Sequence, residues 1–228
     1  MANRPDLECH LTASGVAIYR IPLEVFAGYF AYAHLICVDE RRILVDTGSG
    51  FSHSPRDLIT GLEAIGERFG LHVSLEALTH IIITHAHVDH FGGLHLAQKA
   101  APGALTLTHP LTRPVLIRHD ERVMVTRTAM HDFLKRSGTP DDHRERLMAM
   151  YMMSKQTFPS MRVDETFEDG DRVLDLLDVF HVPGHEAGLV MLRLDDVLLT
   201  ADHILPLTSV AIAPESIMPY TGMGHYLD

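Results

Sequence analysis

The chain lacks several features that mark whole classes of protein. It has no tryptophan and only two cysteines in 228 residues, Cys9 and Cys37, too few for a disulfide framework. Apolar neighbours indicate that both cysteines occupy core positions in strands. No apolar run approaches the roughly 20 residues of a membrane-spanning helix. The N-terminus lacks the charged-then-apolar pattern of a signal peptide. We therefore expect a cytoplasmic protein that does not bind membranes.

Basic charge is also scarce. The chain carries 19 Lys and Arg against 30 Asp and Glu, which gives a formal net charge of −11. Broad binding to a phosphate backbone needs a basic face, so we do not expect nucleic acid as a partner. A small local basic pocket stays open. The length suits one domain with a sizeable core, which we place at residues 1–228.

Common catalytic signatures are missing as well. There is no Gly-x-Ser-x-Gly elbow and no cysteine in a histidine-rich segment, so the chain offers no obvious serine or cysteine nucleophile. No Gly-x-Gly-x-x-Gly opens a helix after the first predicted strand, which argues against dinucleotide binding. The glycine-rich stretch at residues 46–50 is too short for a phosphate loop.

What the chain does have is histidine, 17 in all, and three of them lie in the stretch His85-Ala-His87-Val-Asp89-His90. The apolar run Ile81–Ile83 before it predicts a buried strand. The glycine pair at residues 92–93 predicts a turn into a helix. The cluster would then stand at the carboxyl end of a strand, where α/β folds place their chemistry.

Imidazole and carboxylate are the ligands that zinc and similar divalent ions prefer. His85 and His87 can converge on one ion if the loop curls, and Asp89 and His90 can turn toward a second ion beside it. The alternative is a set of histidines in a surface loop. The strand context favours the metal site, because a motif is supported by the structure that surrounds it.

Apolar patterning elsewhere predicts an α/β protein. Helical spacing marks residues 55–70 and 94–100. Alternating or apolar runs predict strands at residues 15–22, 29–38, 43–45, 80–84, 104–108, 173–180, 189–194 and 197–200, of which the first three suggest an antiparallel meander.

Residues 111–160 lose the strand pattern and indicate a helical insertion, in which a helix starts at Thr139-Pro140. Its methionines would serve core packing or form an adaptable wall for an apolar substrate. One or two of its arginines would meet an anionic group of the substrate, or lie on a solvated face. The insertion could equally be the surface of a homodimer.

Four motifs in order resemble those of the metallo-β-lactamase-fold hydrolases. They are Val45-Asp46-Thr47-Gly48, the histidine cluster at residues 85–90, Pro183-Gly184-His185 and Thr200-Ala201-Asp202-His203. The resemblance runs from about Ile18 to Asp228, apart from the insertion.

The resemblance implies a four-layer αββα sandwich of two mixed sheets, with a binuclear metal site on its edge. It also implies roles for individual residues. His85, His87 and His185 would hold the first ion, Asp89 and His90 the second, and Asp202 would bridge the two; Asp46 would orient the cluster loop, and His203 would be a neighbour rather than a ligand.

One departure from the family pattern concerns the end of the chain. The family supplies a last histidine, in a Pro-Gly-His context on a late strand, to complete the second ion. The chain ends at Asp228 without such a strand. We expect either that it is a fragment without its C-terminal part or that the second ion has fewer ligands, with His225 as a substitute to be considered.

The implied activity is that of a metal-dependent hydrolase, with Asp89 and Asp202 as catalytic residues. A hydroxide that bridges two divalent ions, zinc first and iron or manganese as alternatives, would attack a small acyl substrate. Asp202 resembles the glyoxalase II branch rather than the true β-lactamases, which commonly have cysteine there. A thioester of the hydroxyacylglutathione or acyl-CoA type is therefore the first expectation. The alternatives are a phosphodiesterase or nuclease, a lactonase, and a metal-binding homologue without catalysis.

Overall fold

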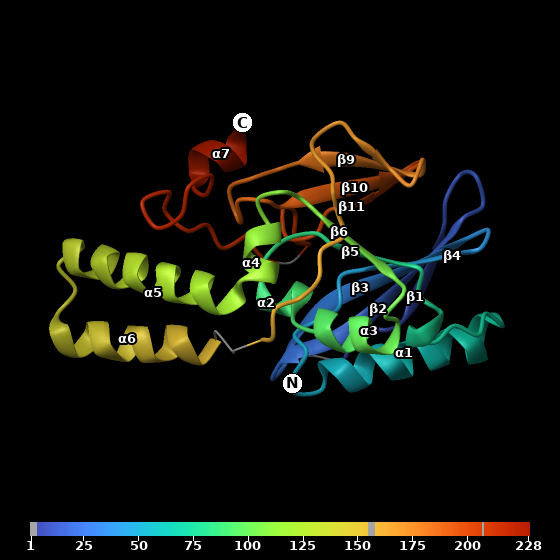
Figure 1. The fold of residues 1–228 in the computed structure, drawn as a ribbon, viewed down its shortest axis with the longest axis horizontal. Coiled ribbons are helices and arrows are strands. Elements are labelled where there is room, and N and C mark those ends of the chain that lie inside the picture. Colours follow the sequence, from blue (N-terminus) through green and yellow to red (C-terminus); the bar gives the residue numbers. More distant parts are fainter. Residues whose placement is uncertain (1–3, 155–157, 207) are drawn as a thin grey trace.

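The computed structural model describes residues 4–154, 158–206 and 208–228. Two β-sheets face each other, and helices cover the free face of the larger one (Figure 1). The larger sheet has the order β1-β2-β3-β4-β5-β6-β7. Its strands are β1 (Glu8–Leu11), β2 (Ala17–Phe26), β3 (Tyr29–Val38), β4 (Arg41–Val45), β5 (His80–Ile83), β6 (Leu105–Thr108) and β7 (Glu165–Thr166). The pairs from β1 to β4 are antiparallel, which confirms the meander, and those from β4 to β7 are parallel.

Strand β2 runs four residues beyond Pro22, where the sequence predicted it to end. Pro22 is tolerated because β1 pairs only as far as Arg20, so β2 is an edge strand at the proline. The Pro22 carbonyl faces that open edge, where it accepts a hydrogen bond from Arg4. The proline nitrogen faces the same side, so the ladder to β3 loses no donor.

The smaller sheet has the order β11-β10-β9-β8 and is antiparallel throughout the described residues. Its strands are β8 (Arg172–Val173), β9 (Leu177–His181), β10 (Val190–Leu194) and β11 (Val197–Leu199). One strand prediction is wrong: residues 173–180 are not one strand, because Leu174 and Asp175 take left-handed φ values of 57° and 54° and turn the chain. Within the described residues, the named strands of this sheet pair only in antiparallel fashion.

Two apolar cores hold the layers together. One lies between the sheets, where Ile36 and Ile82 of the larger sheet meet Val179 and Leu192 of the smaller one. The other packs the larger sheet against α1 (Ser54–Phe69) and α3 (Leu94–Ala100). A short 3₁₀ helix, η1 (Leu75–Ala77), follows α1. Helix α1 ends at Gly70, whose φ of 72° gives the expected left-handed cap. The α/β sandwich is thus confirmed. On the side of the smaller sheet, the described residues include the short helix α7 (Met223–Leu227), which lies near one end of that sheet (Figure 1).

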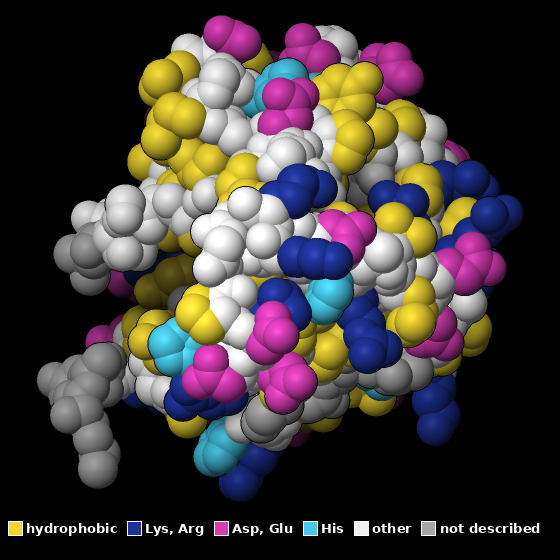
Figure 2. Space-filling view, turned by 90° about the vertical axis from the view of Figure 1, so that its left-hand side faces the viewer, with side chains coloured by type: hydrophobic (Ala, Val, Ile, Leu, Met, Phe, Trp, Pro, Cys, Tyr) yellow, Lys and Arg dark blue, Asp and Glu magenta, His cyan; other side chains and the backbone are white. Residues whose placement is uncertain are grey.

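Three helices occupy the predicted insertion: α4 (Arg113–Ile117), α5 (His119–Arg136) and α6 (Asp141–Ser154). Helices α5 and α6 form a hairpin that projects from the sandwich (Figure 1). On the side from which it projects, charged side chains of both signs mix with apolar ones (Figure 2). Residues 155–157 of the predicted segment lie outside the described residues. None of the described helices has the length and apolar character needed to cross a membrane.

Candidate metal centre

The first half of the candidate site comes from the end of β5. His85 directly follows Thr84 and is fully buried. His87 precedes the one-turn helix α2 (Val88–Phe91), which carries Asp89 and His90. The ring centroid of His85 lies 4.1 Å from that of His90 and 4.9 Å from that of His87. The loop therefore curls so that the imidazoles converge, as the sequence predicted.

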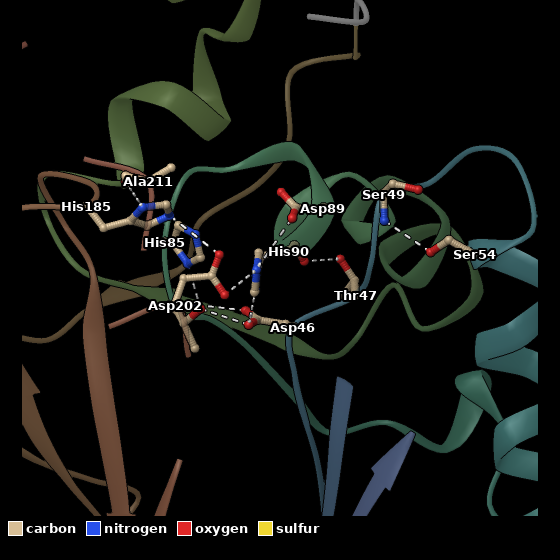
Figure 3. A network of polar contacts seen from close by, with 11 residues as sticks. Asp46, Thr47, Ser49, Ser54, His85, Asp89, His90, His185, Asp202 and Ala211 are labelled. Carbon is tan, nitrogen blue, oxygen red and sulfur yellow. Dashed lines mark hydrogen bonds and ion pairs between the residues drawn. The ribbon is translucent and has the colours of Figure 1, made fainter. Parts of the chain in front are cut away.

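The second half comes from the smaller sheet. His185 lies in the loop after β9, and Asp202 follows β11. The ring centroids of His87 and His185 are 4.4 Å apart. Asp202 reaches between the imidazoles: one carboxylate oxygen lies 3.5 Å from His185 Nε2 and the other 3.3 Å from His90 Nε2 (Figure 3). Asp202 thus occupies the position predicted for the bridge.

Two donor groups result. His85, His87, His185 and Asp202 form one, and Asp89, His90 and Asp202 form the other. Within each group, the ligand atoms lie within 4.8 Å of one another. All six residues that the sequence nominated as ligands are thus brought together, although their chain positions span more than a hundred residues.

Asp46 organises the first half of the site from behind. Its carboxylate accepts hydrogen bonds from the Thr84 backbone N–H and hydroxyl, each at 2.8 Å, and lies 2.8 Å from His90 Nδ1. Asp46 has a left-handed φ of 59°, a conformation that Asp adopts more readily than most residues. This geometry agrees with the orienting role predicted for Asp46.

Two further positioning groups were not predicted. The Thr84 hydroxyl donates to Asp46, so its oxygen is left to accept a hydrogen bond from His85 Nδ1 at 3.1 Å. On the other sheet, His185 Nδ1 donates to the Ala211 carbonyl at 2.6 Å. Thr84 stood next to the cluster in sequence and was the available signal. A carbonyl 26 residues from His185 leaves no trace in the sequence.

Hydrogen bonds at Nδ1 leave Nε2 as the atom of each ring that faces the cluster. The Nε2 atoms of His85, His90 and His185 are buried and have no hydrogen-bond partner among the described residues. Burying a polar nitrogen without a partner is costly. Metal-bound histidines typically direct their second nitrogen to a carboxylate or carbonyl, as these three do directly or through Thr84. The donor set therefore fits divalent ions.

Electrostatics within the cluster favour a charged Asp202. Its burial works toward a higher pKa, but the nearby His185 and His90 outweigh burial and hold the Asp202 pKa well below its ordinary value. Burial lowers the His85 pKa well below its ordinary value, and the neighbouring histidines add to that effect. For His90, burial also works toward a lower pKa, but the carboxylate of Asp46 leads the effects that raise it well above its ordinary value. Asp202 is thus an anion beside several imidazoles.

The first two motifs are locked together through their backbones. The Thr47 N–H donates to the His90 carbonyl at 2.7 Å, and the Gly93 N–H donates to the Gly48 carbonyl at 3.0 Å. A side chain on Gly92 would place its Cβ 2.0 Å from the Ser49 carbonyl oxygen. The glycine pair thus does more than turn the chain, because it lets the residue 46–50 loop pack directly on the cluster.

Two other histidines lie outside the donor groups. His203 packs its ring on that of Tyr226, with centroids 4.7 Å apart, which agrees with the role of neighbour. His225 Nε2 lies 3.0 Å from a carboxylate oxygen of Glu215. The suggestion that His225 substitutes as a ligand is therefore wrong within the described residues, because an acid on its own segment holds its ring elsewhere.

The methionines of α6 do not all have the role of substrate wall that was one of their two predicted roles. Met148 and Met152 line a groove of about 530 Å³ between α5 and α6, and this groove includes none of the cluster residues. Val123 and Tyr151 of the insertion line a different cavity, which His87 of the cluster also lines. Met148 and Met152 are thus not among the residues that line the cavity beside the site.

Comparison with known proteins decides the family. The family model described as the metallo-beta-lactamase superfamily matches residues 27–226. The chain belongs to this superfamily. Its members are mostly metal-dependent hydrolases that bind divalent metal ions, and the His/Asp cluster of the chain is present where the family motifs stand. A search of curated proteins found no match.

Solved structures of superfamily members share the fold. A metallo-beta-lactamase family protein from Thermus thermophilus superposes with a TM-score of 0.70 at 20% identity, covering 92% of this chain and 67% of its own. The FEZ-1 metallo-beta-lactamase from Legionella gormanii gives 0.56 at 16%, covering 85% and 64%. A metallo-beta-lactamase from Cronobacter sakazakii gives 0.51 at 19%, covering 81% and 58%. The chain thus spans about two thirds of the first protein and less of the other two.

Proposed function

We propose that this chain is a binuclear metallohydrolase that cleaves a small acyl substrate, with a thioester as the first choice. The observation that carries the proposal is the convergence of unpartnered, buried Nε2 atoms of His85, His90 and His185 on the carboxylate of Asp202. His85, His87 and His185 would hold one ion, Asp89 and His90 the other, and Asp202 both. Zinc suits the donor set, with iron or manganese as alternatives.

When bound, two such ions supply a water acidic enough to ionise near neutral pH and a Lewis acid for the carbonyl oxygen. The protein does the positioning. Asp46 fixes the His90 ring directly and the His85 ring through Thr84, so neither imidazole needs to reorganise. His185 and His90 hold the pKa of Asp202 well below its ordinary value, so its carboxylate is an anion that both donor groups share. Asp89, whose carboxylate lies 3.8 Å from His90 Nε2, completes the second side.

A thioester is favoured over other acyl substrates by Asp202. A hard carboxylate at the bridge resembles the thioesterase branch of the fold, and a thiolate leaves readily without a strong proton donor. The net charge of −11 argues against a polyanionic nucleic acid.

The test uses protein reconstituted with zinc or with manganese and a panel of acyl-glutathione and acyl-CoA thioesters. We expect turnover that depends on added metal and is abolished by His87→Ala. His203→Ala is the matched control, because His203 is a nearby histidine outside the donor groups and should retain turnover. Metal-loaded protein that cleaves no thioester would overturn the choice of substrate.

A further inference from the structure

A small cavity adjoins the cluster on the side of the insertion. His87 and Phe91 line it from the cluster loop and α2, while Val123 and Tyr151 line it from α5 and α6. Because His87 belongs to both the cavity and the donor group, a molecule in the cavity would end beside the candidate ions. The cavity is therefore placed to receive the part of a substrate next to the reacting carbonyl.

The size of this cavity limits what it can hold. Its volume is about 60 Å³. One water needs roughly 10–15 Å³ on this measure, so the cavity has room for about four to six non-hydrogen atoms. A nucleotide, a tripeptide carrier or a long fatty chain is far larger. The carrier of a thioester must therefore lie outside, and only a short acyl chain fits inside.

The lining is mostly apolar but includes the half-buried Arg122 of α5. The one acid among the described lining residues, Glu186, already accepts a hydrogen bond from the Gly188 N–H at 2.8 Å. Residues 113–154 of the insertion carry eight basic and six acidic side chains, whereas the chain as a whole has a net charge of −11. An anionic group that enters the cavity would thus meet a cation supplied by the insertion, Arg122.

Resting on the proposed hydrolase function, we propose that the cavity selects a short acyl group that ends in a carboxylate, with Arg122 as the specificity residue. The half-thioester of a four- or five-carbon dicarboxylic acid has this chemistry. Beyond its thioester carbonyl, a succinyl group adds about five non-hydrogen atoms, which matches the room available. The guanidinium can hold the far carboxylate through two parallel hydrogen bonds.

The first test compares thioesters of one thiol that differ only in the acyl group: succinyl, butyryl and octanoyl. We expect kcat/KM for succinyl to exceed that for butyryl by about tenfold or more, since a charge-assisted hydrogen bond contributes at least that factor. Octanoyl should be the poorest. Arg122→Ala should collapse the succinyl-to-butyryl ratio toward one, and Arg122→Lys should retain part of it.

A matched control lies little more than one turn along the same helix. Arg127 is exposed and lines the separate groove between α5 and α6, so Arg127→Ala should keep the wild-type ratio. Val123→Phe fills the cavity and should lower succinyl and butyryl turnover together. Thermal melting of each variant identifies any that fail to fold. A succinyl-to-butyryl ratio near one in the wild-type protein would overturn the inference.

A binding measurement separates this inference from the function on which it rests. Calorimetric titration of metal-loaded protein with succinate or butyrate needs no turnover. Tighter binding of succinate that is lost in Arg122→Ala supports the cavity assignment, even if no thioester is cleaved and the proposed function fails. Equal binding of the two acids overturns the cavity assignment, even if thioesters are cleaved.

Discussion

Asp46 Oδ2 lies 2.8 Å from His90 Nδ1, and this pair links the first motif of the sequence to the second. The same carboxylate reaches His85 through the Thr84 hydroxyl. One acid thus sets the ring orientation in both donor groups, although it belongs to neither.

Asp46→Asn should lower metal affinity by about 10–100-fold, because residues that orient metal ligands typically contribute that much. Asn tolerates the left-handed backbone at this position, so the fold should survive. Competition with a chromophoric chelator measures the affinity. Asp57→Asn is the control: Asp57 is buried, accepts from the Glu24 N–H and pairs with Arg4, far along the chain from the cluster. Asp57→Asn should lower the stability of the fold and leave the metal affinity unchanged. Equal metal affinities in the wild type and in Asp46→Asn would contradict the prediction.

Thr84→Val should also weaken metal binding, because valine keeps the shape of threonine but cannot bridge the Asp46 carboxylate to His85 Nδ1. Thr84→Ser restores the hydroxyl and should recover most of the affinity. If Ser and Val variants bind metal equally well, the hydroxyl has no role in orienting His85.

Gly92→Ala should destabilise the fold by at least about 1–3 kcal/mol, the usual cost of overpacking. The added Cβ would lie 2.0 Å from the Ser49 carbonyl, a backbone atom that cannot rotate away. Chemical denaturation measures the change. Gly103→Ala serves as control, since its Cβ would meet nothing within 4 Å. Similar stability in the two variants would show that the loop does not depend on the glycine.

The sequence predicted the candidate metal ligands better than the groups that orient them. His85, His87 and His90 could be read directly, because three imidazoles so close along the chain are rare and follow an apolar strand. His185 and Asp202 needed the family resemblance, since nothing local relates them to a loop a hundred residues away. The Ala211 carbonyl had no signal at all, because every residue has one.

The elements of the fold were also predicted correctly in some places and wrongly in others. Strands with strong apolar patterning were predicted well, and Gly70 marked a helix end correctly. Errors occurred where tertiary context outweighs local pattern. Leu174 looks like a strand residue, yet it turns left-handed so that β8 and β9 can pair. Pro22 looks like a strand end, yet it is accommodated where β2 pairs with β3 alone and has no neighbour on the β1 side.

Acid should destabilise the metal-free protein partly through His109. Its ring stacks on that of His181, with centroids 4.1 Å apart. Burial first, and then His181, lower the His109 pKa from 6.5 to about 4. Between these values the unfolded chain binds more protons, so the contribution of His109 is present above about pH 6.5 and is lost as the pH falls toward 4.

His109→Asn keeps an acceptor for the Leu111 N–H but cannot be protonated. Across this pH range, its free energy of unfolding should vary by about 1–3 kcal/mol less than that of the wild type. Urea denaturation at several pH values measures the difference. His143→Asn, on the exposed surface of α6, should follow the wild-type curve. Parallel curves for His109→Asn and wild type would contradict the buried neutral His109.

If the His/Asp cluster is a metal centre with two ions, anomalous X-ray scattering at the zinc edge should locate both ions in crystals of zinc-loaded protein. We predict two peaks roughly 3.5–4 Å apart, one among His85, His87 and His185, the other beside Asp89 and His90, with Asp202 between them. A single anomalous peak among these imidazoles, or none, would show that the cluster is not a centre for two ions.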